Sequence, residues 1–179
     1  AKDLSLEVVG PGDMAAIATP VDFLGLNNYT RQVVGQKYDF ELGVKKGDGV
    51  ERTEMGWEVY PESIYEMLMQ VSRDYPFKAL YITENGAAFT DRVSPTGEVN
   101  DPQRISYLRR YLAQVARAIA EGAPVKGYFV WSLMDNFEWA LGYRMRFGVI
   151  YVDYETQQRI PKASARWYRG VIANNAILD

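Results

Sequence analysis

Residues 79–86 read ALYITENG, an apolar run that ends abruptly in polar residues. Two further segments share this pattern, VDFLGLNNYT at 21–30 and VKGYFVWSLMD at 125–135. Near-continuous apolar runs of this length are typical of strands in a parallel sheet that is covered on both faces. We therefore predict three buried parallel strands, each followed by polar residues at its carboxyl end.

Helical patterns separate the predicted strands. After the second strand, Asp101 can cap a helix that has Pro102 at its first position and that ends at Gly122. Apolar residues recur along it at steps of three and four, namely Ile105, Leu108, Leu112, Val115 and Ile119. We expect these residues to form the buried face of the helix.

A second, weaker helical pattern begins at Pro61 and ends at Tyr75-Pro76, before the middle strand. Its apolar face comprises Ile64, Leu68 and Val71. Residues 38–56 are charged, contain glycine and have no clear period, so we expect a long loop there. The alternation of strands and helices predicts an α/β fold.

The C-terminal residues predict two smaller features. GVIYVDY at 148–154 and QQRI at 157–160 are expected to form a small hairpin. A final helix is expected to start near Pro161, with Ala165, Tyr168, Val171 and Ile172 on its apolar face. Three strand–helix units make only part of a (β/α)₈ barrel, which takes about 250 residues, so we expect a partial fold.

Composition excludes several classes of function. The 179 residues carry a net charge of −3 without a cluster of Lys and Arg, so we expect neither nucleic acid nor a membrane surface as a partner. Because Cys and His are both absent, disulfides, Cys/His zinc sites, Cys nucleophiles and a Ser-His-Asp relay are excluded within this chain. We expect no metal and no cofactor, and the chemistry must use carboxylates, Tyr or Lys.

Apolar runs in this sequence are short. None reaches the roughly 18 residues that a membrane span needs, and the first residues, AKDLSLEVVG, contain no hydrophobic signal core. On this basis we expect a cytoplasmic protein.

Ligands of α/β folds bind at the carboxyl ends of the strands, where Glu84 follows the middle strand. A carboxylate held rigidly and partly desolvated at this position suits a nucleophile or a general base. The alternative is an ordinary acid at a strand end, bonded to loop amides. The first strand contributes Asn27 and Tyr29 to the same edge of the sheet.

Aromatic residues flank a second carboxylate after the third strand. Glu138 lies between Trp131 and Trp139 in the sequence. A carboxylate that accepts two hydroxyls beside indole rings is a common way to hold a sugar, because sugars have apolar faces and a hydroxylated rim. The alternative is a loop acid in a salt bridge.

Four segments carry a resemblance to a known family. They are FLGLNNYTR at 23–31, MGWEVYPESIY at 55–65, YITENGAAF at 81–89 and VKGYFVWSLMDNFEWALGYRMRFGVIYVDYETQQR at 125–159. They closely resemble the C-terminal part of bacterial retaining β-glucosidases of glycoside hydrolase family 1, and the resemblance runs nearly end to end. It implies that residues 1–179 are a single segment, about strands six to eight, of a (β/α)₈ TIM barrel that needs an N-terminal half.

The resemblance also implies a catalytic pair. Glu84, in the family's TENG motif, would be the nucleophile that forms a glycosyl ester, and Tyr29 would donate its hydroxyl to this carboxylate. Asn27 would lie in the same pocket. Asp135 and Asn136 follow the third strand, and we expect them to shape the loop rather than to touch substrate.

The resemblance implies five substrate contacts. Glu138 would accept the O4 and O6 hydroxyls of a terminal glucose, Trp139 would donate to a ring hydroxyl, and Trp131 would form the platform under the sugar. Phe147 would add a wall, with plain core packing as the alternative, and Trp57 would stack on the leaving-group side. A carboxylate at position 138 would repel a phosphate, which favours neutral β-glucosides over 6-phosphorylated ones.

The family's acid/base Glu, in a TxNEP motif, has no counterpart in this sequence. Three accounts are compatible with that absence. The chain is one part of a β-glucosidase that an N-terminal half completes, or it is a truncated-barrel scaffold, or it is a sugar-binding module that uses Trp131, Glu138 and Trp139 without turnover. In each account the isolated chain is expected to be inactive.

Overall fold

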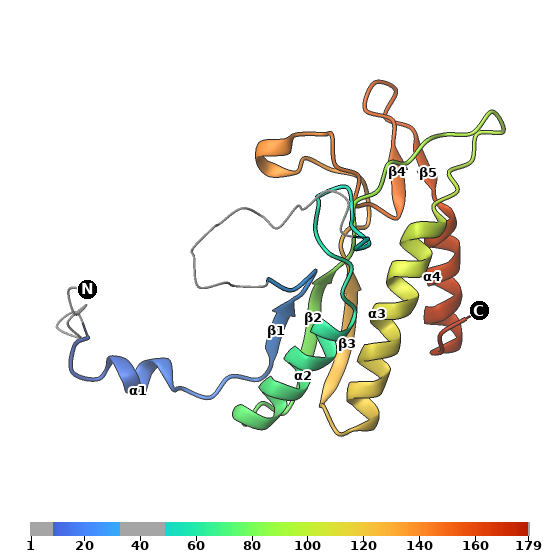
Figure 1. The fold of residues 1–179 in the computed structure, drawn as a ribbon. Helices are drawn as coiled ribbons and strands as arrows, with labels where there is room; N and C mark the ends of the chain where they lie inside the picture. Colours follow the sequence, from blue (N-terminus) through green and yellow to red (C-terminus); the bar gives the residue numbers. More distant parts are fainter. Residues whose placement is uncertain (1–8, 33–48, 179) are drawn as a thin grey trace.

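The computed structural model describes residues 9–32 and 49–178 (Figure 1). Three parallel strands form a sheet in the order β1 (Leu24–Asn27), β2 (Leu80–Asn85) and β3 (Val125–Val130). Each strand lies inside one of the three apolar segments, so the prediction of three parallel strands is confirmed.

Three helices pack side by side on one face of this sheet, as Figure 1 shows. They are α2 (Glu62–Asp74), α3 (Pro102–Ala120) and α4 (Ala163–Asn174). The core between the helices and the sheet is built from apolar side chains that include Ile64, Leu68, Leu80, Ile82, Leu108 and Val115. The burial of Ile64 and Leu68 confirms the predicted face of α2.

The other face of the sheet is bare in the part of the chain that the structure describes. Side chains alternate along a strand, so Leu24 and Leu26 reach the helices while Gly25 and Asn27 between them are exposed. On β3, the side chain of Phe129 is 56% exposed. The prediction that both faces are covered is therefore wrong for the described residues, because all three packed helices lie on one side.

The smaller elements follow the predictions in part. Strands β4 (Ile150–Val152) and β5 (Arg159–Pro161) form the predicted antiparallel hairpin. The last helix begins at Ala163, near Pro161 as predicted, and Pro161 itself belongs to β5. Of the expected loop at 38–56, residues 38–48 lie outside the described residues.

A short helix that the sequence pattern did not indicate, α1 (Asp13–Ile17), lies away from the sheet in Figure 1 and buries none of its residues. None of the helices in residues 9–32 and 49–178 has the length and apolar character needed to cross a membrane.

The buried face of α3 differs from the predicted one. Leu108 and Val115 are buried as expected, but Ile119 is 48% exposed. The rest of the buried face consists of Arg104, Tyr107, Tyr111 and Ala118. Apolar periodicity missed this face because the polar side chains on it are buried with hydrogen-bond partners. On α4, Ile172 is likewise exposed and not part of the core.

Six charged side chains meet where the strands end, and we call them the buried charge cluster. They are Asp91, Asp101, Asp135, Arg104, Arg146 and Lys162, and all except Arg146 are almost fully buried. Lys162 Nζ lies 2.5 Å from Asp91 Oδ2 and 2.8 Å from Asp135 Oδ1. Lys162 thereby joins the loop after β2 to the loop after β3.

Arg104 and Asp101 extend the cluster to the helix layer. The guanidinium of Arg104 pairs with Asp91 and Asp101 and donates to the backbone oxygen of Ala87. Asp101 stands at the cap position of α3, as predicted, but its side chain makes no capping bond there. It accepts hydrogen bonds from the backbone nitrogen and the hydroxyl of Ser164 instead, which ties α3 to α4.

Replacing Lys162 by methionine tests the cluster. This change leaves Asp91 and Asp135 buried without their shared cation, so we expect the free energy of unfolding to fall by about 3–5 kcal/mol. The control Arg117→Met breaks an exposed ion pair with Glu121 and a contact with the Tyr65 ring, and should cost no more than about 1 kcal/mol. Urea unfolding followed by tryptophan fluorescence measures both, and equal losses would contradict a stabilising role for the cluster.

Candidate active site

The carboxyl end of β2 brings Glu84 into contact with Tyr29, two residues beyond β1. Tyr29 Oη donates to Glu84 Oε2 over 2.6 Å. The two strands are paired at this point, because the backbone nitrogen of Asn28 donates to the backbone oxygen of Glu84 over 3.0 Å. Hydrogen bonds to a carboxylate are strong, so Tyr29 fixes the orientation of the Glu84 carboxylate.

Two further rings pack around Tyr29. The centroids of Tyr29 and Trp57 are 5.3 Å apart, and those of Tyr29 and Phe147 are 6.2 Å apart. Trp57 and Phe147 also contact each other, with centroids 6.1 Å apart. Residues from three separate loops therefore form one aromatic wall beside the carboxylate, and Phe147 is buried in it.

A second carboxylate, that of Glu138, feels the charge of Glu84. Burial raises the pKa of Glu138, and the negative charge of Glu84 raises it further. Burial, the hydrogen bond to Glu84 and the charges of Glu84 and Glu138 all raise the pKa of Tyr29 above its usual value. The phenol thus remains a protonated donor at neutral pH, and the charges of Glu84 and Glu138 both act on it.

The backbone of Trp131 is hydrogen-bonded to β2, the strand that bears Glu84. Its backbone nitrogen donates to the backbone oxygen of Asn85 over 2.8 Å. At the next residue, Gly86, an added Cβ atom would overlap the carbonyl oxygen of Trp131. Only glycine leaves room for this approach, which sets Trp131 close to the end of β2.

Asp135 shapes the loop after β3, as the sequence predicts. It accepts from the backbone nitrogen of Gly148 over 3.0 Å and pairs with Arg146 and Lys162. Asn136 likewise folds back, because its side chain donates to Ser132 Oγ over 3.0 Å. The loop that carries Glu138 and Phe147 is therefore closed on itself by polar contacts.

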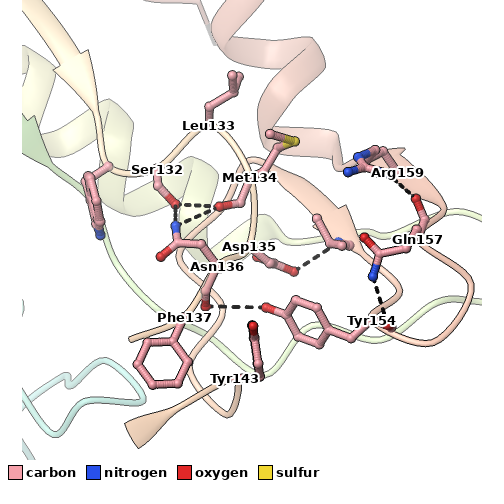
Figure 2. A pocket seen from close by; sticks show the side chains of 12 residues that line it. Ser132, Leu133, Met134, Asp135, Asn136, Phe137, Tyr143, Tyr154, Gln157 and Arg159 are labelled. Atoms are coloured by element: carbon pink, nitrogen blue, oxygen red, sulfur yellow. Dashed lines mark hydrogen bonds between the residues drawn. The ribbon is translucent and has the colours of Figure 1, made fainter. Parts of the chain in front are cut away.

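A cavity of about 500 Å³ lies along this loop (Figure 2). Figure 2 shows Phe137, Tyr143 and Tyr154 grouped on one side of it, with Ser132 and Asn136 hydrogen-bonded on another. Trp131 contributes to the lining, whereas Glu84 and Tyr29 do not. The cavity is thus separate from the Tyr29–Glu84 contact and meets the predicted site residues at Trp131 alone.

Asn27 and Trp139 are two predicted site residues that the contacts described so far do not include. Asn27 lies opposite Glu84 in the strand register, and its side-chain oxygen accepts a hydrogen bond from Thr83 over 2.6 Å. Trp139 begins a short 3₁₀ helix, Trp139–Leu141, with a φ of 41° and a side chain that is 84% exposed. Left-handed backbone in a bulky residue is strained and is commonly found at functional sites.

Comparison with known proteins assigns the family. The sequence model described as glycosyl hydrolase family 1 matches residues 4–177. The chain belongs to glycosyl hydrolase family 1. It is 52% identical over 170 residues to a 1,4-beta-D-glucan glucohydrolase of Thermotoga neapolitana, and 50% identical over 170 residues to beta-glucosidase A of Thermotoga maritima.

This chain also matches the solved structure of a family 1 relative. The Thermotoga maritima beta-glucosidase in complex with castanospermine superimposes with a TM-score of 0.87 at 50% identity and covers 93% of this chain. The chain spans 38% of that protein, and 38% of each of the two curated relatives. The predicted fold class, a portion of a (β/α)₈ barrel, is confirmed.

Sequence reasoning missed two buried polar side chains behind Glu84 in this family 1 chain. Tyr107 and Tyr111 are both fully buried and hydrogen-bonded to the backbone oxygen of Tyr29. A signal was present, because tyrosines four residues apart share one face of a helix. Apolar periodicity alone gave these two positions no weight.

Removing the charge of Glu84 tests whether the two carboxylates share a site. In Glu84→Gln, the pKa of Glu138 should fall towards its ordinary value, while burial keeps part of the shift. A ¹³C NMR titration of the Glu138 carboxyl carbon measures it, with Glu62→Gln on α2 as the control that leaves it unchanged. An identical Glu138 titration in wild type and Glu84→Gln would contradict this arrangement.

Proposed function

We propose that this chain is the nucleophile-bearing part of a retaining β-glucosidase, and that an N-terminal part of the same enzyme completes the barrel and the site. The observation that carries the proposal is the 2.6 Å hydrogen bond from Tyr29 to Glu84 at the end of β2, in a chain that belongs to family 1. The β-glucosidase relatives that it matches at about half identity support the substrate class.

In the first step, Glu84 attacks the anomeric carbon of a terminal β-glucoside. Tyr29 holds Oε2, so Oε1 forms the new C–O bond while the bond to the leaving oxygen breaks. The leaving oxygen takes a proton from an acid about 5–5.5 Å from Glu84, the separation typical of retaining enzymes. We assign that acid to a Glu of the N-terminal part, and Asn27 to the same pocket.

In the second step, water cleaves the ester. The acid/base, now a carboxylate, removes a proton from the water, whose oxygen attacks the anomeric carbon. The bond to Glu84 breaks, and its carboxylate returns to the hydrogen bond with Tyr29. Two inversions at one carbon release β-glucose.

The glucose is held by the residues around the two carboxylates. Glu138 accepts the O4 and O6 hydroxyls, Trp139 donates to a ring hydroxyl, and Trp131 stacks under the sugar. Phe147 walls the pocket, and Trp57 stacks on the leaving-group side. The exposed indole of Trp139 and the raised pKa of Glu138 support a surface prepared for a hydroxylated ligand.

The edges of the sheet support an N-terminal part. Within residues 9–32 and 49–178, β1 and β3 are the two edges of the three-stranded sheet and have no further strand partner, and such edges invite pairing with further strands. Beside β3, Phe129 and Leu133 are 56% and 62% exposed, and a groove of about 620 Å³ has a largely apolar lining. Apolar surface of this kind is typical of an interface.

Turnover separates this proposal from a scaffold or a sugar-binding module. We define the completed enzyme as this chain joined to the N-terminal part of Thermotoga maritima beta-glucosidase A, its 50% identical relative. The isolated chain should show no hydrolysis of an aryl β-glucoside, whereas the completed enzyme should hydrolyse it. Normal turnover by the isolated chain, shown by mass spectrometry to contain no second polypeptide, would contradict the proposal.

Glu84→Ala tests the nucleophile in the completed enzyme. We expect hydrolysis to fall by more than about a thousandfold, and azide to restore cleavage by entering the space of the lost carboxylate. Azide attack from that face gives the α-glucosyl azide, which NMR identifies. Glu62→Ala, on the surface of α2, should keep full activity. An unchanged rate in Glu84→Ala would remove Glu84 from this role.

A further inference from the structure

The backbone carbonyl of Tyr29 accepts two hydrogen bonds from the helix layer. Tyr107 Oη donates to it over 3.0 Å and Tyr111 Oη over 2.9 Å. Both tyrosines lie on α3, both are fully buried, and their rings stack with centroids 4.1 Å apart. A carbonyl oxygen has two lone pairs, so this acceptor is saturated by the two phenols.

The same network reaches the residue next to Glu84. Asn85 Nδ2 donates to the backbone oxygen of Asn28 over 2.8 Å and to Tyr107 Oη over 3.1 Å. Its side-chain oxygen accepts from Tyr128 Oη over 2.5 Å. The hydroxyl of Tyr107 thus contacts both the carbonyl of Tyr29 and the side chain of Asn85, the residue that follows Glu84.

We propose that Tyr107 and Tyr111 are positioning residues that aim the phenol of Tyr29 at Glu84. This inference rests on the proposed function, because it concerns how the nucleophile is held. The two tyrosines act through the peptide of Tyr29. Rotation of this peptide would leave its carbonyl without two donors and both phenol O–H groups without their acceptor.

Packing alone does not account for tyrosine at these positions. Phenylalanine would fill the same volume and stack in the same way, but each such substitution would remove one of the two donors to the carbonyl of Tyr29. Burial raises the pKa of Tyr107 and of Tyr111, so both remain protonated donors across the physiological range. Position and protonation state therefore both suit donation to the Tyr29 carbonyl.

Crystal structures of the 179-residue chain carrying Tyr111→Phe or Tyr107→Phe test the proposal. The matched control is Tyr168→Phe on α4, which removes a partly buried hydroxyl that donates to the backbone oxygen of Tyr128 over 3.2 Å. In Tyr111→Phe and Tyr107→Phe, the distance from Tyr29 Oη to Glu84 Oε2 should lengthen from 2.6 Å to beyond about 3.2 Å. In Tyr168→Phe it should be unchanged.

Kinetics in the completed enzyme give the second readout. Tyr111→Phe should lower kcat about tenfold with KM nearly unchanged, because misplacing a catalytic group by a fraction of an ångström affects the transition state most. Tyr168→Phe should match wild type. An unchanged Tyr29–Glu84 distance in both tyrosine variants, or a wild-type kcat in Tyr111→Phe, would overturn the inference.

Failure of the proposed function gives a different result. If the wild-type completed enzyme does not hydrolyse β-glucosides, the proposed function fails. The Tyr29–Glu84 distances in the chain itself still decide whether Tyr107 and Tyr111 position Tyr29.

Discussion

The loops around Glu84 depend on one constraint, which is that Asp135 is fully buried and must be neutralised. Lys162 and Arg146 supply that neutralisation, and Lys162 extends it to Asp91 in the loop after β2. Because buried charges without partners are costly, an arrangement of these loops that keeps all three pairs is favoured. The loop that bears Glu138 and Phe147 is positioned by the same pairing.

The helix layer forms the core and also contacts the backbone near the site. Apolar residues of α2 and α3 pack on the sheet, but Tyr107 and Tyr111 pass through this layer to reach the backbone beside Glu84. The charge cluster thus orders the loops after β2 and β3, and the tyrosines order the segment after β1. All three strand ends receive support from side chains where the ladder of backbone hydrogen bonds stops.

The sequence predicts local secondary structure but misses contacts between residues that are far apart in the chain. Strands, helices and the hairpin follow from apolar runs and periodicity within a few residues. The buried roles of Lys162 and Tyr111 do not, because their partners Asp91 and Tyr29 lie 71 and 82 residues away in the chain. The bare sheet face had an unused local signal, since Gly25 and Asn27 alternate with leucines along β1. The pairing of Tyr29 with Glu84 came from family resemblance, as no spacing rule joins residues on different strands.

The central claim is that Glu84 forms the covalent bond to glucose while Tyr29 orients it. Trapping the completed enzyme with an activated 2-deoxy-2-fluoro-β-glucoside and mapping the labelled peptide by mass spectrometry tests this claim most directly, because fluorine slows breakdown of the ester. The account predicts a single fluoroglucosyl ester on the peptide that contains Glu84. An active enzyme that carries the label on Glu138 or elsewhere, or that turns over without any labelled Glu84, would contradict it.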